Sequence, residues 1–223
     1  MIPLARAKAI LLMVRNGETP EMFRELAHRM YSDEASYVLR RDLTVSLTPR
    51  PVAKIPFSIR PLQASDLAHV VVERPRRLPV LRADIPTCYV ATTQDGSICY
   101  MQWLVTVDQQ SRLRPYFKGE LASYGTDTVL LEFAYTFKRF RGAGIMGAAM
   151  AEIAEQGLQH GARWALTYVK NDNIPSLKGC AKAGFRPYML RSEIWRAFRL
   201  HQSFRAFDAP TRYPFESERQ GNR

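Results

Sequence analysis

Residues 128–147 read TVLLEFAYTFKRFRGAGIMG, and this stretch has the strongest local structural signals in the sequence. Its first nine residues are apolar almost throughout and rich in β-branched and aromatic side chains, which predicts a buried strand over 128–136. Glu132 is the one carboxylate within that strand. A short basic segment and three glycines follow, and helix formers then continue to about residue 161. The stretch therefore predicts a strand, a glycine-containing turn and a helix.

The flanking sequence extends this unit on both sides. Residues 162–169 (ARWALTYV) predict a second strand, and a helix capped by Asn173 follows it and ends at Gly184. Upstream, two β-rich runs at 88–92 and 98–107 are separated by an Asp-Gly pair, which indicates a hairpin. The remaining expected elements are a helix from residue 19, strands over 36–43 and 57–60, a helix from residue 65, an irregular loop over 112–126 and a strand-like stretch over 192–207.

The chain of 223 residues has room for one main domain and an appendage. Three prolines between residues 48 and 56 predict an extended linker, so we expect an N-terminal extension over 1–55. The extension should be helical with one strand, and its first 14 residues form an amphipathic pattern. That segment is expected to dock on the domain, with a targeting or membrane role as the alternative. The main domain should cover 56–210, and a polar C-terminal tail 211–223.

Lys and Arg outnumber Asp and Glu by 32 to 21, which gives a formal net charge of +11. Such a surface attracts anions, whether nucleic acid, acidic lipid or a phosphorylated cofactor. The cations are spread along the chain without a block of five or six, so nucleic acid stays open as a partner but is not favoured. No apolar run approaches the roughly 20 residues of a transmembrane helix. The three cysteines and four histidines show no disulfide framework and no metal-ligand spacing, which predicts a metal-free cytoplasmic protein.

The turn at residues 139–144 has the chemistry of a phosphate site. Its glycines let a ligand approach the backbone, and free N–H groups at the start of a helix favour an anion. The string Gly142, Gly144, Gly147 also satisfies GxGxxG, so a dinucleotide-binding fold must be considered. That interpretation fits poorly, because few residues remain for further βαβ units and no acid occurs near residues 162–165, where a ribose-binding acid is expected. An NAD(P)-dependent oxidoreductase is therefore the least favoured alternative.

Two motifs together resemble the GNAT superfamily of acyl-CoA-dependent N-acyltransferases. The family's [Gln/Arg]-x-x-Gly-x-[Gly/Ala] turn, which grips the CoA pyrophosphate, reads here Arg139-Phe140-Arg141-Gly142-Ala143-Gly144. A second motif follows the next strand at matching spacing, as Asn173, Ser176, Cys180, Gly184 and Phe185. The resemblance covers about residues 57–185. It implies a mixed α/β (α+β) fold, with a twisted, mostly antiparallel sheet flanked by helices.

The resemblance implies acetyl-CoA, or another acyl-CoA, as co-substrate and no metal. Two strands would separate and admit the pantetheine arm, which would pair with main-chain groups near residues 134–136. An N–H group there would also polarise the thioester carbonyl. The implied cofactor-binding residues are Ala134, Tyr135, Thr136, Arg139, Phe140, Arg141, Gly142, Ala143, Gly144, Asn173 and Ser176.

Three residues are candidates for the chemistry. Several GNAT enzymes carry a glutamate at the position of Glu132, which implies a general base or an amine-binding carboxylate; a structural acid is the alternative. Cys180 stands where many members have a tyrosine that protonates the departing thiolate. A thiol is an admissible donor, although a small buried cysteine also suits packing. Tyr168 and solvent are the other candidate donors.

The sequence thus predicts an N-acyltransferase that moves an acyl group, most simply acetyl, from acyl-CoA to a primary amine by direct attack in a ternary complex. A non-catalytic acyl-CoA sensor, or an RNA- or protein-binding module on the same fold, is the main alternative. The acceptor would be a small molecule or a peptide amine, held by variable loops within 74–86 and 112–126. A homodimer is left open.

Overall fold

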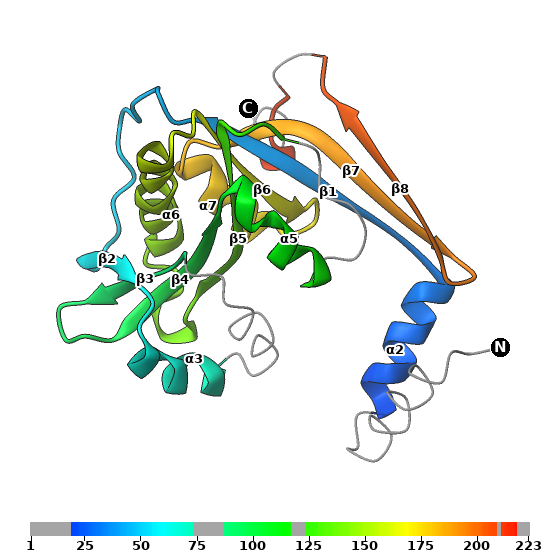
Figure 1. Cartoon of the computed structure of the whole chain (residues 1–223), viewed down its shortest axis with the longest axis horizontal. Coiled ribbons are helices and arrows are strands. Elements are labelled where there is room, and N and C mark those ends of the chain that lie inside the picture. Colours follow the sequence, from blue (N-terminus) through cyan, green and yellow to red (C-terminus); the bar gives the residue numbers. More distant parts are fainter. Residues whose placement is uncertain (1–18, 74–86, 117–123, 209–210, 218–223) are drawn as a thin grey trace. The chain divides into compact units, whose positions relative to one another are not determined.

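The computed structural model describes residues 19–73, 87–116, 124–208 and 211–217 (Figure 1). The chain divides into two compact units: unit 1 comprises Met1–Ala35 and Arg191–Phe204, and unit 2 comprises Ser36–Leu190 and Arg205–Arg223. The amphipathic segment expected over residues 1–14 and the candidate acceptor loop at 74–86 lie outside the described residues.

Unit 1 joins a helix to the end of a hairpin. It contains α2 (Thr19–Met30), the start of β1 (Tyr31–Asp42), the end of β7 (Arg186–Arg196) and most of β8 (Arg199–Ala206). The hairpin turn at Ala197 and Phe198 has positive φ angles, and its two N–H groups donate to the carbonyls of Met30 and Arg29 at 2.8 Å each. The turn thereby satisfies carbonyl groups at the end of α2 that have no partner within the helix.

Within the described residues, eight strands form one sheet in the order β2-β3-β4-β5-β6-β1-β7-β8. The strands of unit 2 not yet given are β2 (Phe57–Pro61), β3 (Cys88–Thr93), β4 (Ile98–Val105), β5 (Thr128–Thr136) and β6 (Trp164–Lys170). Neighbouring strands from β2 to β5 pair antiparallel, β5 and β6 pair parallel, and β6 and β1 pair antiparallel. The mixed, mostly antiparallel sheet expected from the sequence is confirmed.

The central strands are apolar because both of their faces are covered. All eight residues of β4 are buried, as are the first five of β5. A strand covered on both faces needs a continuous apolar run rather than alternation, which is the pattern of residues 128–136. The Asp95-Gly96 pair forms the predicted turn between β3 and β4, with Gly96 at φ +80°.

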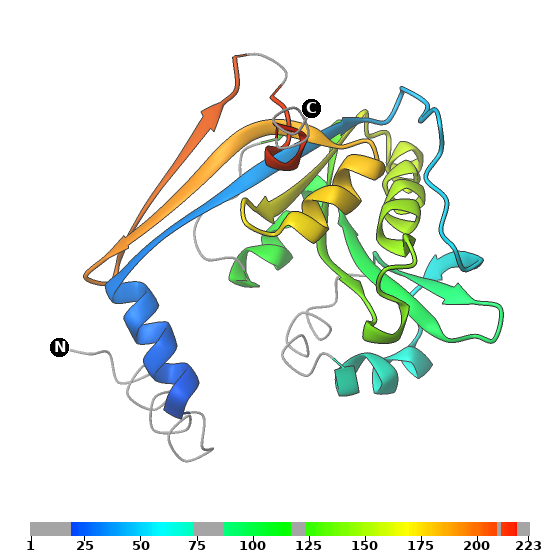
Figure 2. The ribbon, with the colours of Figure 1, turned by 180° about the vertical axis from the view of Figure 1, so that it is seen from behind.

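Helices flank this sheet. In the described part of unit 2, the longest helix is α6 (Ile145–Glu155). Its small, apolar residues are mostly buried, and it packs against β4, β5 and α7 (Ile174–Lys182) (Figures 1 and 2). The shorter helical elements are η1 (Ala64–Asp66), α3 (Leu67–Glu73), η3 (Val107–Gln109), α5 (Gln110–Leu113), η4 (Arg114–Tyr116), η5 (Lys138–Phe140), η6 (Gln156–His160) and α8 (Pro214–Ser217). Among the described residues, no helix is long and apolar enough to cross a membrane.

The second half of β1 departs from the expected domain organisation. Residues 36–42, assigned from the sequence to an N-terminal extension, pair with the whole length of β6, from Ser36 opposite Lys170 to Asp42 opposite Trp164. Val38 and Leu39 are fully buried. This segment is therefore part of the sheet rather than of an appendage, because its apolar residues cover an edge of β6 that would otherwise lack hydrogen-bond partners.

The C-terminal segment also departs from the expected polar tail. Tyr213 is 1% exposed, and its hydroxyl group donates to the Phe185 carbonyl at 2.8 Å. Its ring stacks on that of Phe215, with 5.0 Å between the ring centroids. Residues 211–217 thus anchor this end of the chain to the start of β7, a contact that local composition does not indicate.

We expect Tyr213→Phe to lower the free energy of unfolding by about 1 kcal/mol, because the substitution keeps the buried ring and removes one hydrogen bond to the Phe185 carbonyl, which still accepts from Arg186 Nη1 at 3.1 Å. Urea denaturation checks this. Phe215→Leu serves as the comparison, since it changes the stacked ring and keeps the hydrogen bond. An unchanged midpoint for Tyr213→Phe would show that the bond adds no net stability.

Candidate functional site

A bulge interrupts β5 beside its neighbour β4. Met101 lies opposite Tyr135 and Trp103 lies opposite Glu132, so β5 uses one residue more than β4 over this interval. Phe133 in the bulge has φ +57°, which is uncommon for a residue with a side chain. Bulges redirect the backbone and occur often beside functional sites. This one changes the direction of β5 between Glu132 and Ala134.

The pairing between β5 and β6 stops just before the bulge. The parallel pairs run from Thr128 opposite Trp164 to Leu130 opposite Leu166, and the described residues form none beyond them. β6 itself continues to Lys170 by pairing with β1 on its other edge. The separation that the family resemblance implies is therefore present. The edge of β5 over residues 134–136 that faces β6 has no strand partner in the described structure.

Glu132 lies where the two strands part. Its side chain is 8% exposed, and its Oε1 accepts a hydrogen bond of 3.0 Å from the backbone N–H of Tyr168 in β6. The Tyr168 side chain is half-buried. One carboxylate thus bridges β5 and β6 at the point where main-chain pairing ends.

A tyrosine that the sequence did not single out is close to this carboxylate. Burial raises the pKa of Tyr124, the nearby Gln110 side chain lowers it, and the charges of Tyr168 and Glu132 raise it further. The Tyr124 hydroxyl group is buried and forms no hydrogen bond of good geometry with a described residue. Only its position within residues 112–126 could have drawn attention to it; the sequence predicted an irregular loop there, whereas the structure is helical as far as Tyr116.

Cys180 is packed in the interior of unit 2. Its side chain is fully buried, and its Sγ lies 3.7 Å from Met150 Sδ. Burial first, and then the nearby Glu132 charge, raise the pKa of the thiol. A thiol with a raised pKa holds its proton more tightly, so this environment favours a packing role over proton donation.

The turn between β5 and α6 has the open geometry that a phosphate group needs. Gly142 and Gly144 have φ +78° and +77°, and a Cβ added to Gly142 would meet no atom within 4 Å. Within the described structure, the N–H groups of residues 142–146 donate no hydrogen bond to another residue. The positive end of the α6 dipole adds to these free donors.

The linker expected over residues 48–56 contacts one side of this turn. Lys54 N donates to the Ala143 carbonyl at 2.8 Å, and a Cβ on Gly144 would lie 3.3 Å from the Val52 carbonyl oxygen. Phe140, which precedes the glycines of the turn, is buried. At Gly144 a side chain would meet both a left-handed backbone conformation and the nearby linker. At Gly142 a side chain would meet only the left-handed conformation, because the space around it is open.

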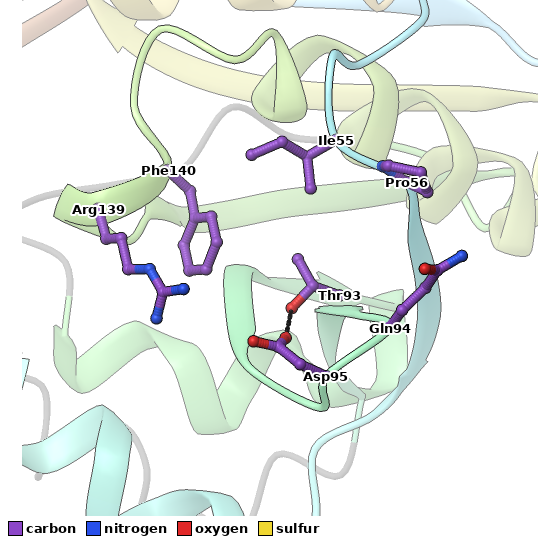
Figure 3. A pocket seen from close by; sticks show the side chains of 7 residues that line it. All are labelled: Ile55, Pro56, Thr93, Gln94, Asp95, Arg139 and Phe140. Carbon is purple, nitrogen blue, oxygen red and sulfur yellow. Dashed lines mark hydrogen bonds between the residues drawn. The ribbon is translucent and has the colours of Figure 1, made fainter.

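Three cations surround the turn, namely the exposed Lys138, Arg139 and Arg141. Arg141 Nε donates to the Thr136 carbonyl at 3.3 Å, and the Arg139 guanidinium lies 5.1 Å from the centre of the Phe140 ring. Beside Arg139 is a pocket of about 350 Å³, shown in Figure 3. Its lining residues are Ile55, Pro56, Thr93, Gln94, Asp95, Arg139 and Phe140.

Asn173 and Ser176, from the second motif, form a helix cap. Asn173 Oδ1 accepts a hydrogen bond of 3.3 Å from Ser176 N at the start of α7. This contact explains the Asn-x-x-Ser spacing by helix capping alone. Contact of these two residues with a cofactor stays a prediction.

The residues present fit an acyl-CoA. A pyrophosphate needs several N–H donors and nearby cations, which residues 138–146 provide. An extended amide-containing arm needs an unpaired strand edge, which β5 provides at residues 134–136. Among the described residues, no three His, Cys, Asp or Glu side chains come together as a metal site.

Comparisons with known proteins bear on the fold. No protein-family model matches the chain, and no curated protein matches it. Among solved structures, a GNAT-family acetyltransferase from Colwellia psychrerythraea matches with a TM-score of 0.50 and 12% identity, covering 81% of this chain and 59% of that one. A conserved protein of unknown function from Staphylococcus epidermidis matches with a TM-score of 0.51 and 9% identity, covering 79% of this chain and 66% of that one. The chain therefore spans less than two thirds of the length of either structure.

Proposed function

Because this chain has the fold of the GNAT acetyltransferases, we propose that it transfers an acyl group from acyl-CoA to a primary amine. One juxtaposition carries the proposal: a buried carboxylate and a turn with free N–H groups lie at the two ends of the β5 edge that faces β6 and has no strand partner over residues 134–136 in the described structure. Glu132 is at one end of the stretch and the Gly142 turn follows the other.

The turn would bind the diphosphate of the co-substrate. N–H groups of residues 142–146 would donate to phosphate oxygens, and Arg139 and Arg141 would offset their charge. The main chain of residues 134–136 would pair with the amides of the pantetheine arm, as an added strand pairs with a sheet edge. Acyl-CoA supplies an acyl group activated as a thioester.

Glu132 would prepare the amine. An ammonium ion has no lone pair, so one proton must leave before nitrogen can attack the carbonyl carbon. In the proposed step Glu132 accepts that proton directly or through water, the C–N bond forms and the C–S bond breaks. The Tyr168 N–H bond to Oε1 holds the carboxylate in place at the end of the β5–β6 pairing.

The thiolate that leaves must gain a proton. Of the two candidate donors named from the sequence, Tyr168 is favoured over Cys180, because the tyrosine ring is partly exposed whereas the thiol is fully buried with a raised pKa. Solvent is the remaining donor. The acceptor would be a small-molecule or peptide amine.

Isothermal titration calorimetry should show acetyl-CoA and CoA binding in the micromolar range, because several N–H donors and two arginines face the same diphosphate. Incubation with acetyl-CoA and a panel of amines should then release free thiol. NADH is the matched control, since it carries a diphosphate without a pantetheine arm. Absence of CoA binding at millimolar ligand would remove the proposal, and binding without thiol release across the panel would indicate a sensor.

A further inference from the structure

Glu73, the last residue of α3, contacts the start of the candidate phosphate turn. Its Oε1 accepts a hydrogen bond of 2.7 Å from the backbone N–H of Lys138, the first residue of η5. The same oxygen accepts a hydrogen bond of 3.1 Å from the hydroxyl group of Tyr135 in β5. A single carboxylate thus joins α3, the end of β5 and the turn.

The contact continues from Tyr135 to a cation of the turn. The Tyr135 hydroxyl group accepts a hydrogen bond of 3.4 Å from Arg141 Nη2, and the guanidinium lies 5.5 Å from the centre of the tyrosine ring. Tyr135 itself is 8% exposed, so its ring has little freedom to move. By orienting the Tyr135 hydroxyl group, Glu73 also orients Arg141.

The negative charge of Glu73 by itself opposes the binding of a diphosphate at the turn. A carboxylate beside a turn that binds diphosphate repels the ligand, since like charges a few ångströms apart oppose each other even near a protein surface. The two hydrogen bonds have the opposite effect, because they hold the turn in the shape that presents Gly142 and Arg141. The two effects have opposite signs, and substitutions can separate them.

We propose that Glu73 is a positioning residue for the phosphate turn, acting through Lys138 N–H and the Tyr135 hydroxyl group rather than by touching the ligand. The inference rests on the proposed binding of acyl-CoA. Loss of both bonds would free the backbone at Lys138 and the Tyr135 hydroxyl group, and would leave Arg141 oriented mainly by its bond to the Thr136 carbonyl, so the turn would have to be ordered when CoA binds.

Two substitutions at this position make the test. Glu73→Ala removes the charge and both bonds, and we expect it to raise the Kd for CoA by about 5- to 20-fold. Glu73→Gln removes only the charge, since its amide oxygen accepts the same two bonds, and we expect a Kd within about 2-fold of the original. In steady-state assays Glu73→Ala should raise KM for acyl-CoA and leave kcat and the amine KM unchanged, a split that general loss of structure would not produce.

Asp33→Ala is the control, because it removes an acid that pairs with Arg196 in unit 1. Its CoA affinity should stay unchanged. If Glu73→Ala does not fold, Tyr135→Phe, which removes only the hydroxyl group, carries the test and should raise the Kd by about 2- to 5-fold.

Three other outcomes would count against the proposed role of Glu73 or against the proposed function. Equal or tighter CoA binding by Glu73→Ala, or by Tyr135→Phe where that variant carries the test, would overturn the positioning role. Equal weakening by the alanine and glutamine variants would overturn it too, since a variant that keeps both hydrogen bonds would then bind CoA as poorly as one that lacks them. If the unsubstituted protein binds no CoA, both the proposed function and the role of Glu73 fail. If the protein binds CoA with the same affinity whether or not Glu73 is replaced, only the role of Glu73 fails.

Discussion

Replacing Glu132 by glutamine is expected to lower kcat for acyl transfer by about 100- to 10,000-fold, the range that a positioned general base contributes. The amide keeps an oxygen that can accept the Tyr168 N–H bond, so the junction of β5 and β6 should stay intact. It cannot take a proton from an ammonium ion. Affinity for CoA should change by no more than about 3-fold, because the carboxylate lies at the opposite end of the β5 edge from the phosphate turn.

The pH profile separates a base from a structural acid. With glutamate, kcat should fall as pH drops and the carboxylate becomes protonated; with glutamine the residual rate should lose that dependence. Glu152→Gln is the matched control, since Glu152 is a partly buried acid on α6 whose own pKa burial raises. If Glu132→Gln is as active as the control variant, Glu132 is not a general base, and its role is the structural one of linking β5 to β6.

The second large effect is expected at Gly142. Gly142→Val should weaken CoA binding by roughly 30-fold or more, because the side chain fills the space that the phosphate needs and the left-handed φ of +78° disfavours a β-branched residue. Loss of one or two hydrogen bonds to a charged ligand, about 1.5–3 kcal/mol each, accounts for that magnitude. Calorimetry with CoA measures it.

Gly161 provides a control with the same backbone strain. It has φ +73°, and an added Cβ meets nothing within 4 Å, but it ends η6 rather than forming the turn. Gly142→Val and Gly161→Val should therefore lose similar stability in thermal unfolding, by about 1–3 kcal/mol. Only the first should lose CoA affinity. Equal CoA binding by the two variants would contradict a phosphate site at Gly142.

The sequence predicted those elements whose signals are local. The buried strand at 128–136, the Asp95-Gly96 hairpin and the helix after Gly144 were all identified from apolar runs and turn residues, and all are present. The position of β1 could not be predicted, because its partner β6 is far along the chain and strand pairing leaves no local mark. Tyr213 was missed for the same reason, since its contact is with the distant Phe185.

The candidate site was predicted in part. Motif spacing identified the residues of the turn, and the structure gives that turn free N–H groups and exposed cations. The sequence did not indicate the bulge at Phe133, because no glycine or proline marks it. Nor did it connect Glu73 with Lys138, since one is at a helix end and the other starts a distant turn.

The pairing of β1 with β6 bears on how this chain is made. During synthesis, residues 36–42 leave the ribosome before their partner, which emerges over a hundred residues later. Until then the nascent polypeptide carries an unpaired β-segment, and unpaired strand edges make incompletely folded chains prone to aggregation. Because contacts so distant along the chain slow folding, the sheet closes at a late stage, after translation has passed the glycine turn.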